Sequence, residues 1–305
     1  NKNVYLGCGQ SELQPELSMV QEKRELMMRI CNTKASVKDK QPIEELTHSL
    51  SAGGSSGKKS KTNKKKTKAL ASHAGGNPGL AKSNEQPYST SFYSYEMFGH
   101  VEQTVDRYLE LANKTKDALK PVATPCIDDH LIPADEFEKR GELSPVAARI
   151  VLKALYVARL ARLDVLWSVN MLARDVTRWT AACDRRLHRL ICYLRFTKEW
   201  AQVCYVGDSV SKCYLALFCD ASFAGDLTDS KSTSGGVLCL VGPNTFVPIS
   251  WLCKKQGAVS HSTSEAEIIS LDTCARLEGL PALILWDLVI DVFEPNASTN
   301  QPKHL

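Results

Sequence analysis

The sequence lacks any apolar run long enough to cross a bilayer. Its longest apolar stretch, "GLPALILWDLVI" at 279–290, carries an acid at Asp287 and is shorter than the roughly 20 residues that a membrane-spanning helix needs. The first residues, "NKNVYLGCGQSELQ", lack the apolar segment of a secretory signal peptide. We therefore expect an intracellular protein of the cytoplasm or nucleus that has no membrane partner.

The cysteines lack the spacing of a metal site or a disulfide framework. All 11 are scattered without a C-x-x-C pair, and several lie in apolar runs, namely Cys192, Cys213, Cys219 and Cys239. Zinc sites and small disulfide-rich domains use closely spaced, patterned cysteines. The pattern therefore favours buried reduced thiols. His188 also has no partner at ligand spacing, which indicates a surface residue rather than a metal ligand.

Acidic residues are absent from one segment and scarce in another. The stretch 58–68, "KKSKTNKKKTK", holds seven lysines and no acid, and residues 139–198 hold 13 Lys or Arg against four Asp or Glu. Residues 213–305 have the opposite balance, with five basic and ten acidic side chains. This separation suggests that the basic part binds a polyanion and the acidic part a cation. Ordinary variation of solvated surface charge is the alternative.

The first third of the chain changes composition sharply. Residues 51–87 are rich in Gly, Ser, Lys, Asn and Pro and nearly free of large apolar side chains, which predicts a disordered insertion. Its lysine run is best interpreted as a solvated linker, and the alternatives are a contact to nucleic acid or a nuclear signal. Before the insertion, "VYLGCG" predicts a short strand without a partner, and "ELSMVQEKRELMMRI" predicts a helix.

Helical patterns dominate the basic middle of the chain. "HVEQTVDRYLELA" predicts a short amphipathic helix, and three further helices are expected to begin at Ser144 with Pro145, at Asp164 and at Thr177. Arginines crowd the last of these helices. The resulting candidates for nucleic-acid binding are Arg178, Arg185, Arg186, Arg189 and Arg195.

The pattern changes to strands after residue 208. "KCYLALFCD", "SGGVLCLVG" and "TFVPISWLCKK" are β-rich runs separated by turn residues, which is typical of an antiparallel meander. A helix follows at "STSEAEIISLDTCARLEG", where Ser262 and Glu265 have the spacing of a capping box. Ser262 and Thr263 are also candidates for bonds to a nucleic-acid backbone. Gly279 and Pro281 predict a stop before another helix, "ALILWDLVIDVF".

The first of these strands leads to an acid, Asp220, which is followed by small residues that leave room for a bound group. Hard cations such as Mg²⁺ take several carboxylate oxygens from rigid elements. Glu265 and Glu267 compete to be the second ligand. At about 100° per residue, Glu267 shares an apolar arc of its helix with Ile268, Leu271, Cys274 and Ala275. We expect this arc to face the sheet and Glu267 to point toward Asp220, with Glu265 as the cap.

Ordered motifs in this part resemble a known family. "CDASFAGDLTDSKSTSGGVLCLVG", "PISWLCKKQ" and "SHSTSEAEIISLD" resemble the ribonuclease H domain of copia-type LTR retrotransposon Pol polyproteins in order and spacing. Upstream, "YLGC", "ALYVARLARLDVLWSVNMLAR" and "RRLHRLICYLRFT" resemble the tail of its reverse transcriptase and the helices that link the two domains. The lysine-rich insertion and the change of Arg-Pro-Asp to Arg162-Leu163-Asp164 depart from the family pattern.

The resemblance implies an α+β fold, in which a helical reverse-transcriptase connection precedes a partial ribonuclease H-like, three-stranded antiparallel sheet with helices. The expected segments are a reverse-transcriptase remnant at 1–50, the disordered insertion at 51–90, a helical thumb or connection-like region at 91–208, and the partial ribonuclease H-like domain at 209–305. The resemblance also implies that Asp220 and Glu267 are catalytic ligands in a site that holds two Mg²⁺ or Mn²⁺ ions when intact. The implied partners are an RNA–DNA hybrid or other nucleic acid and the rest of the Pol polyprotein.

The family's polymerase aspartates and two of its four ribonuclease H carboxylates have no match in this chain. We therefore expect a fragment that binds nucleic acid without turnover and exposes the apolar arc of "ALILWDLVI". The intact polyprotein is expected to act as an RNA-directed DNA polymerase and a ribonuclease of RNA–DNA hybrids. The alternative is a domesticated or decayed, non-catalytic module that binds nucleic acid or a protein.

Overall fold

The computed structural model describes residues 3–5, 7–13, 18, 22, 90–226 and 229–293. The lysine-rich insertion lies outside these residues, and so does almost all of the helix predicted at "ELSMVQEKRELMMRI". A search of the described residues finds no helix with the length and apolar character needed to span a bilayer.

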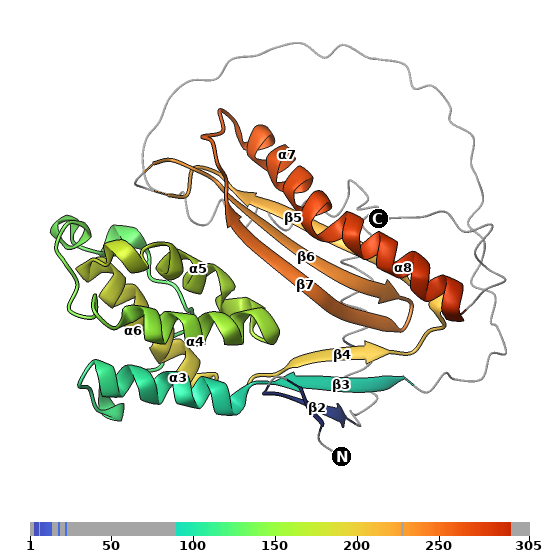
Figure 1. The fold of residues 1–305 in the computed structure, drawn as a ribbon, viewed down its shortest axis with the longest axis horizontal. Helices are drawn as coiled ribbons and strands as arrows, with labels where there is room; N and C mark the ends of the chain where they lie inside the picture. Colours follow the sequence, from blue (N-terminus) through green and yellow to red (C-terminus); the bar gives the residue numbers. More distant parts are fainter. Residues whose placement is uncertain are drawn as a thin grey trace, which may run out of the picture. The chain divides into compact units, whose positions relative to one another are not determined.

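Seven strands form one antiparallel sheet (Figure 1). In spatial order they are β1 (Asn3–Tyr5), β2 (Cys8–Leu13), β3 (Ser91–Glu96), β4 (Gln202–Val206), β7 (Thr245–Lys255), β6 (Thr233–Gly242) and β5 (Tyr214–Ser222). The predicted meander of β5, β6 and β7 is confirmed and forms one end of this sheet. The α+β fold class is confirmed as well.

The N-terminal strand has partners, so the expectation of an unpaired strand was wrong. β1 and β2 form a hairpin whose turn contains Gly7, with a φ of 77° that suits glycine. β2 then pairs with β3, and β3 with β4. β3 follows β2 only after the long insertion, so no local sequence pattern could reveal the pairing of β2 with β3. A single residue pair, Tyr205 with Phe246, joins β4 to β7.

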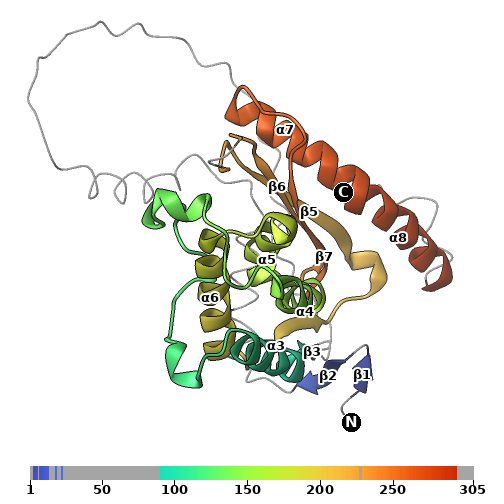
Figure 2. The ribbon, with the colours of Figure 1, turned by 60° about the vertical axis from the view of Figure 1, so that its left-hand side comes forward.

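Four helices pack together beside the sheet (Figure 2). They are α3 (Phe98–Leu111), α4 (Ala147–Leu160), α5 (Leu166–Arg174) and α6 (Ala181–Phe196). Short 3₁₀ turns lie at Lys116–Ala118, Asp129–Leu131, Ala134–Phe137, Leu163–Val165, Val176–Arg178 and Val210–Lys212. The apolar stripes read from the sequence form the core, in which Ile150, Val169, Leu187 and Leu190 are fully buried.

The helices are confirmed, but their predicted starts were wrong. Ser144 lies in a turn, where its N–H donates to the Gly141 carbonyl at 3.3 Å, and α4 begins at Ala147 without a side-chain cap. Asp164 lies in a 3₁₀ turn and its carboxylate accepts hydrogen bonds from Arg162 instead of capping α5. Thr177 also lies in a 3₁₀ turn, ahead of α6. At Ser144 and Asp164, other hydrogen bonds within the same segment take the place of the predicted caps.

A long helical segment covers β5 and β6. It consists of α7 (Thr263–Cys274), a π-helical turn (Ala275–Gly279) and α8 (Leu280–Phe293). The cap is as predicted, since the Ser262 hydroxyl accepts a hydrogen bond from the Glu265 N–H at 3.1 Å. The predicted stop at Gly279 and Pro281 was wrong, because Pro281 sits in the first turn of α8. Proline has no backbone N–H to donate, and the π-helical turn before it accommodates the missing hydrogen bond.

The face of α7 that packs on the sheet differs from the predicted arc. Its buried residues are Ala266, Ser270 and Cys274, whereas Ile268 is 66% exposed and Leu271 is 55% exposed. Small side chains are needed here because the helix approaches the sheet closely: a Cβ on Gly236 would lie 2.5 Å from the Cys274 sulfur. The close packing of α7 on Gly236 therefore decides which face of the helix is buried, and the apolar periodicity does not.

Candidate nucleic-acid groove

A hollow of about 610 Å³ lies between α5 and β7. Its helical wall contains Trp167, Asn170 and Arg174, which share one face of α5 at helical spacing. Its other wall includes Trp251 and Lys255, which share one face of β7 because they are an even number of residues apart. The groove thus forms where a helix face and a strand face meet.

Two hydrogen bonds hold the walls of the groove together. The side-chain amide of Asn170 donates to the Cys253 carbonyl at 2.9 Å, and the Trp251 indole N–H donates to the Ala158 carbonyl of α4 at 2.8 Å. The Trp167 indole is 38% exposed. The Trp251 indole is therefore held in place at the groove, and Trp167 is open to solvent.

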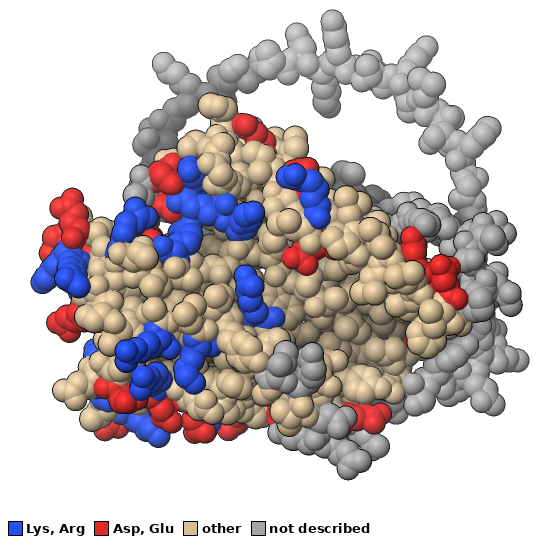
Figure 3. All heavy atoms as spheres, in the orientation of Figure 1, with Lys and Arg blue, Asp and Glu red and all other residues tan. Residues whose placement is uncertain are grey.

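Four basic side chains line this groove: Arg159, Arg174, Lys254 and Lys255. Figure 3 shows Lys and Arg side chains spread over this face of the molecule. Arg159 and Lys254 are exposed, and among the described residues neither forms an ion pair. Basic side chains that line a hollow together with exposed aromatic rings are the combination that binds nucleic-acid backbones and bases.

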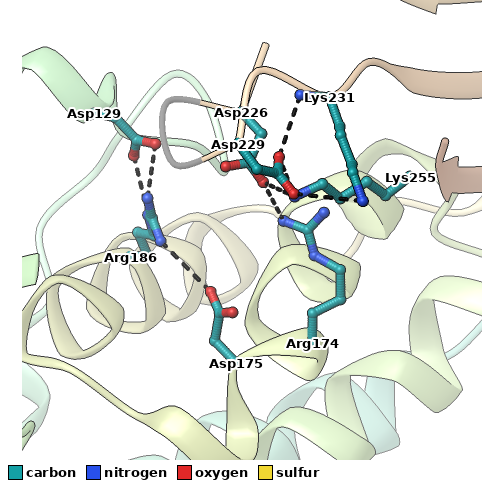
Figure 4. Close-up of polar contacts among 8 residues, drawn as sticks. All are labelled: Asp129, Arg174, Asp175, Arg186, Asp226, Asp229, Lys231 and Lys255. Carbon is teal, nitrogen blue, oxygen red and sulfur yellow. Dashed lines mark hydrogen bonds and ion pairs between the residues drawn. The ribbon is translucent and has the colours of Figure 1, made fainter. Parts of the chain in front are cut away.

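Two aspartates neutralise the other two groove cations (Figure 4). Asp226 accepts from Lys255 Nζ at 2.5 Å and from Arg174 at 3.3 Å, and Asp229 lies 2.7 Å from Lys255 Nζ. Burial opposes the charged form of Lys255, but the hydrogen bonds to Asp226 and Asp229 outweigh it and raise the pKa of the ammonium. The hydrogen bond from Lys255 in turn lowers the pKa of Asp229. The carboxylates of Asp226 and Asp229 therefore occupy the hydrogen-bonding positions around Lys255 and Arg174 that a phosphate would take.

The predicted ligand Asp220 is exposed and lines an adjoining hollow of about 360 Å³. This hollow also includes Trp167 and Trp251, so it is continuous with the basic groove. Asp220 lies opposite Gly235 in β6, two residues before the end of β5. The carboxylate therefore stands on the face of the sheet that α5 contacts.

The structure does not bring Asp220 and Glu267 together. Successive side chains of a strand point to opposite faces, and Cys219, next to Asp220, lies on the face covered by α7. There burial raises the pKa of Cys219 to about 12, with further contributions from Cys274 and the Glu267 charge. Glu267 is thus close to Cys219, on the opposite face from Asp220.

These donors do not fit a pair of magnesium ions. Over the described residues, no group of three or more His, Cys, Asp or Glu side chains is placed to hold a metal ion. Mg²⁺ requires near-octahedral oxygens, which two carboxylates on opposite faces of a sheet cannot supply. The catalytic role of Asp220 and Glu267 stays a prediction.

Most of the predicted arginines of α6 are held within the fold. Arg185 pairs with Glu136, with one contact at 2.7 Å, and Arg186 binds Asp129 through two contacts at 3.0 and 2.7 Å (Figure 4). Arg189 donates to the carbonyl and hydroxyl oxygens of Thr124 at 2.9 and 3.0 Å.

Arg178 and Arg195 are different, since neither has a carboxylate partner in the part of the chain that the structure describes. Ser262 is used as the cap of α7, and Thr263 is the exposed first residue of that helix. His188 was expected at the surface but is half-buried, and it shares a hydrogen bond of 2.8 Å with the Tyr108 hydroxyl.

Sequence reasoning missed the groove cations Arg159, Arg174, Lys254 and Lys255. A signal for two of them was present, since Lys254 and Lys255 follow Trp251 in "ISWLCKKQ". The spacing of Trp167, Asn170 and Arg174 also places them on one helix face. No pattern indicated that this helix face would lie against that strand.

Comparison with known proteins identifies relatives among transposon proteins. The "Retrovirus-related Pol polyprotein from transposon RE2" of Arabidopsis thaliana is 31% identical over 186 residues, which cover 61% of this chain and 12% of the relative. The corresponding polyprotein from transposon TNT 1-94 of Nicotiana tabacum is 30% identical over 176 residues, or 55% of this chain and 12% of the relative. An uncharacterised mitochondrial protein of Arabidopsis thaliana is 31% identical over 127 residues and is covered to 50%.

These matches confirm the predicted relationship to retrotransposon Pol polyproteins. The chain spans about one eighth of the length of the Pol relatives that it matches. No protein-family profile matches the chain. No solved structure matches it either.

Proposed function

We propose that this chain, a relative of one segment of retrotransposon Pol polyproteins, binds an RNA–DNA hybrid or another nucleic acid in the groove between α5 and β7. The observation that carries the proposal is the lining of the groove, which combines four basic side chains with two tryptophans. Phosphate contacts from Lys and Arg supply most non-specific affinity, and the exposed indole of Trp167 offers a stacking platform for a base. The rest of the polyprotein is the expected partner.

The chain binds without cleaving the strand. Asp220 stands at the edge of the groove as an exposed carboxylate, but Glu267 lies on the other face of the sheet. Polymerase and hybrid-ribonuclease activity, together with the two Mg²⁺ or Mn²⁺ ions of the family site, are proposals for the longer polyprotein. Incubation of the purified chain with a labelled RNA–DNA hybrid in Mg²⁺ or Mn²⁺ should leave the RNA intact. Cleavage that disappears in the Asp220→Asn variant would overturn this part of the proposal.

The location of binding is tested with two matched double variants. One replaces the unpaired groove cations, as Arg159→Gln with Lys254→Gln, and the other replaces the unpaired cations near α6, as Arg178→Gln with Arg195→Gln. Affinity for a fluorescent RNA–DNA hybrid is measured by anisotropy at several salt concentrations.

The groove variant should bind more weakly, and its slope of log K against log salt should be shallower by about 2, or about 1 for each lost phosphate contact. The α6 variant should match the unmodified protein. The reverse result would place the binding surface on α6 and refute the groove.

A protein-binding module is the second candidate. α8 has no buried residue, and six of its large apolar residues are more than half exposed, namely Leu280, Ile284, Leu285, Leu288, Val292 and Phe293. Exposed apolar patches of this kind mark interaction surfaces or aggregation sites. If neither double variant changed nucleic-acid binding, the protein-binding module would be favoured.

A further inference from the structure

A second hollow, of about 400 Å³, lies against the C-terminal half of α3 and the middle of α6. It shares no lining residue with the basic groove or with the hollow beside Asp220. Its volume is in the range of small-molecule sites. The groove and its proposed function leave this hollow without a role.

The polar floor of this hollow is satisfied internally. The Tyr108 hydroxyl, 1% exposed, lies 2.8 Å from His188 Nδ1, and the Cys192 sulfur lies 3.6 Å from His188 Nε2. Burial and the nearby Lys114 charge lower the pKa of His188, which favours the neutral imidazole. In a neutral imidazole one ring nitrogen donates and the other accepts, and the Tyr108 hydroxyl and the Cys192 thiol satisfy both. The floor is therefore fixed and uncharged.

The charges around the hollow are mostly used within the fold. Asp184 accepts from the Glu142 N–H at 2.6 Å and from the Trp179 indole at 2.6 Å. Arg185 and Arg189 are held by Glu136 and Thr124, as described above. Lys114, Lys120 and the exposed Glu142 carboxylate remain, and within the described residues none of the three has an oppositely charged side chain within ion-pair distance. The two ammonium groups therefore outnumber the one unpaired carboxylate at this hollow.

The rest of the lining is mainly apolar, with Val122, Ile127 and Leu143 as its largest aliphatic side chains. A ligand that fits must therefore combine an apolar or flat body with an anionic group. The body would lie against the aliphatic wall and above the imidazole of His188, and the anion would contact Lys114 and Lys120. A sulfate-sized ion alone would leave most of the volume unfilled.

We propose that this hollow binds a nucleoside monophosphate, with its phosphate on Lys114 and Lys120 and its base and sugar against the aliphatic wall. The same chemistry is offered by a free nucleotide and by the 5′-terminal nucleotide of a phosphorylated strand. The site is separate from the groove, so it stands or fails independently of the proposed function.

The test measures binding of AMP to the full chain by calorimetry and by the NMR signals of His188. AMP should bind, and the double variant Lys114→Gln with Lys120→Gln should bind it about ten-fold more weakly, which corresponds to about 1.4 kcal/mol. The matched control is Lys116→Gln, because Lys116 comes from the same segment but lies 3.9 Å from Asp106 and does not line the hollow. This control should leave binding unchanged.

Two further ligands separate the parts of the proposal. Inorganic phosphate and adenosine should each bind at least about ten-fold more weakly than AMP, since each lacks half of the contacts. A 5′-phosphorylated single strand that loses affinity in the double variant, compared with its 5′-hydroxyl form, would identify a strand end as the source. Absence of AMP binding at millimolar concentration, or equal AMP binding by the double variant and the unmodified chain, would overturn the proposal.

Discussion

Replacing Asp226 and Asp229 with asparagine should strengthen nucleic-acid binding by the groove. In the structure these carboxylates hold Lys255 and Arg174, whose side chains are 20% and 34% exposed. A phosphate must displace the carboxylates before it can contact either cation. The variant removes this competition and two negative charges, whereas the shape of the turn is nearly conserved by asparagine.

The size of the effect follows from the number of cations released. Two cations, Lys255 and Arg174, join the two that are already unpaired. Each additional phosphate contact steepens the slope of log K against log salt by about 0.9 for a duplex, so the slope should steepen by about 1.8. Between about 50 and 200 mM salt, the affinity of the double variant should then fall about ten-fold further than that of the unmodified chain.

The assay is fluorescence anisotropy of a labelled RNA–DNA hybrid over that salt range, with near-UV circular dichroism to confirm that the variant is folded. Asp175→Asn is the matched control, because Asp175 lies 3.9 Å from Arg186 and does not line the groove. This control should reproduce the unmodified slope. A folded double variant whose slope is unchanged, or whose affinity at low salt is lower, would refute the competition between the aspartates and phosphate.

Three further predictions concern stability and solubility. Arg162→Met should destabilise the fold by about 3 kcal/mol in chemical denaturation, because it removes the donor to the buried Thr197 carbonyl at 2.9 Å and leaves Asp164 with the Tyr193 hydroxyl in place of its ion pair at 2.8 Å. Burial and the Asp164 carboxylate raise the pKa of Tyr193 to about 12, so the folded state keeps this proton while the unfolded state loses it near pH 10. The free energy of unfolding should therefore fall as pH rises from about 10 to 12, and Tyr193→Phe should remove the part of this loss that comes from the Tyr193 proton. Leu285→Lys, at a side chain that is 62% exposed, should reduce aggregation measured by light scattering without lowering the melting temperature.

Matched controls sharpen these three tests. Arg185→Met removes an ion pair whose arginine is 51% exposed, and it should cost less than about 1 kcal/mol. Equal losses at both arginines would contradict the argument from burial. If the stability of Tyr193→Phe depended on alkaline pH in the same way as that of the unmodified chain, other groups would control this dependence. Aggregation that persists in the α8 variant would point to another exposed surface.

The elements that could be predicted are those whose signal is local. The meander of β5 to β7 follows from alternating apolar residues and turn residues within about forty positions, and the cap of α7 from the spacing of Ser262 and Glu265. The relationship to Pol polyproteins was also present in the motifs. In contrast, the pairing of β2 with β3 joins residues on either side of the long insertion. Nothing local distinguishes that pairing from an unpaired strand.

The sequence by itself determined the fold class, the positions of most helices and strands, and the concentration of positive charge in residues 139–198. Only the tertiary structure decided which of those charges remain available. Arg185 and Arg186 meet carboxylates some fifty residues away, whereas Arg159 and Lys254 converge on a groove and have no such partner among the residues that the structure describes. Helical phase likewise tells which residues share a face, but the close approach of α7 to Gly236 selected the small-residue face for burial. Both outcomes depend on contacts between distant segments, and a one-dimensional pattern carries no information about which segments will meet.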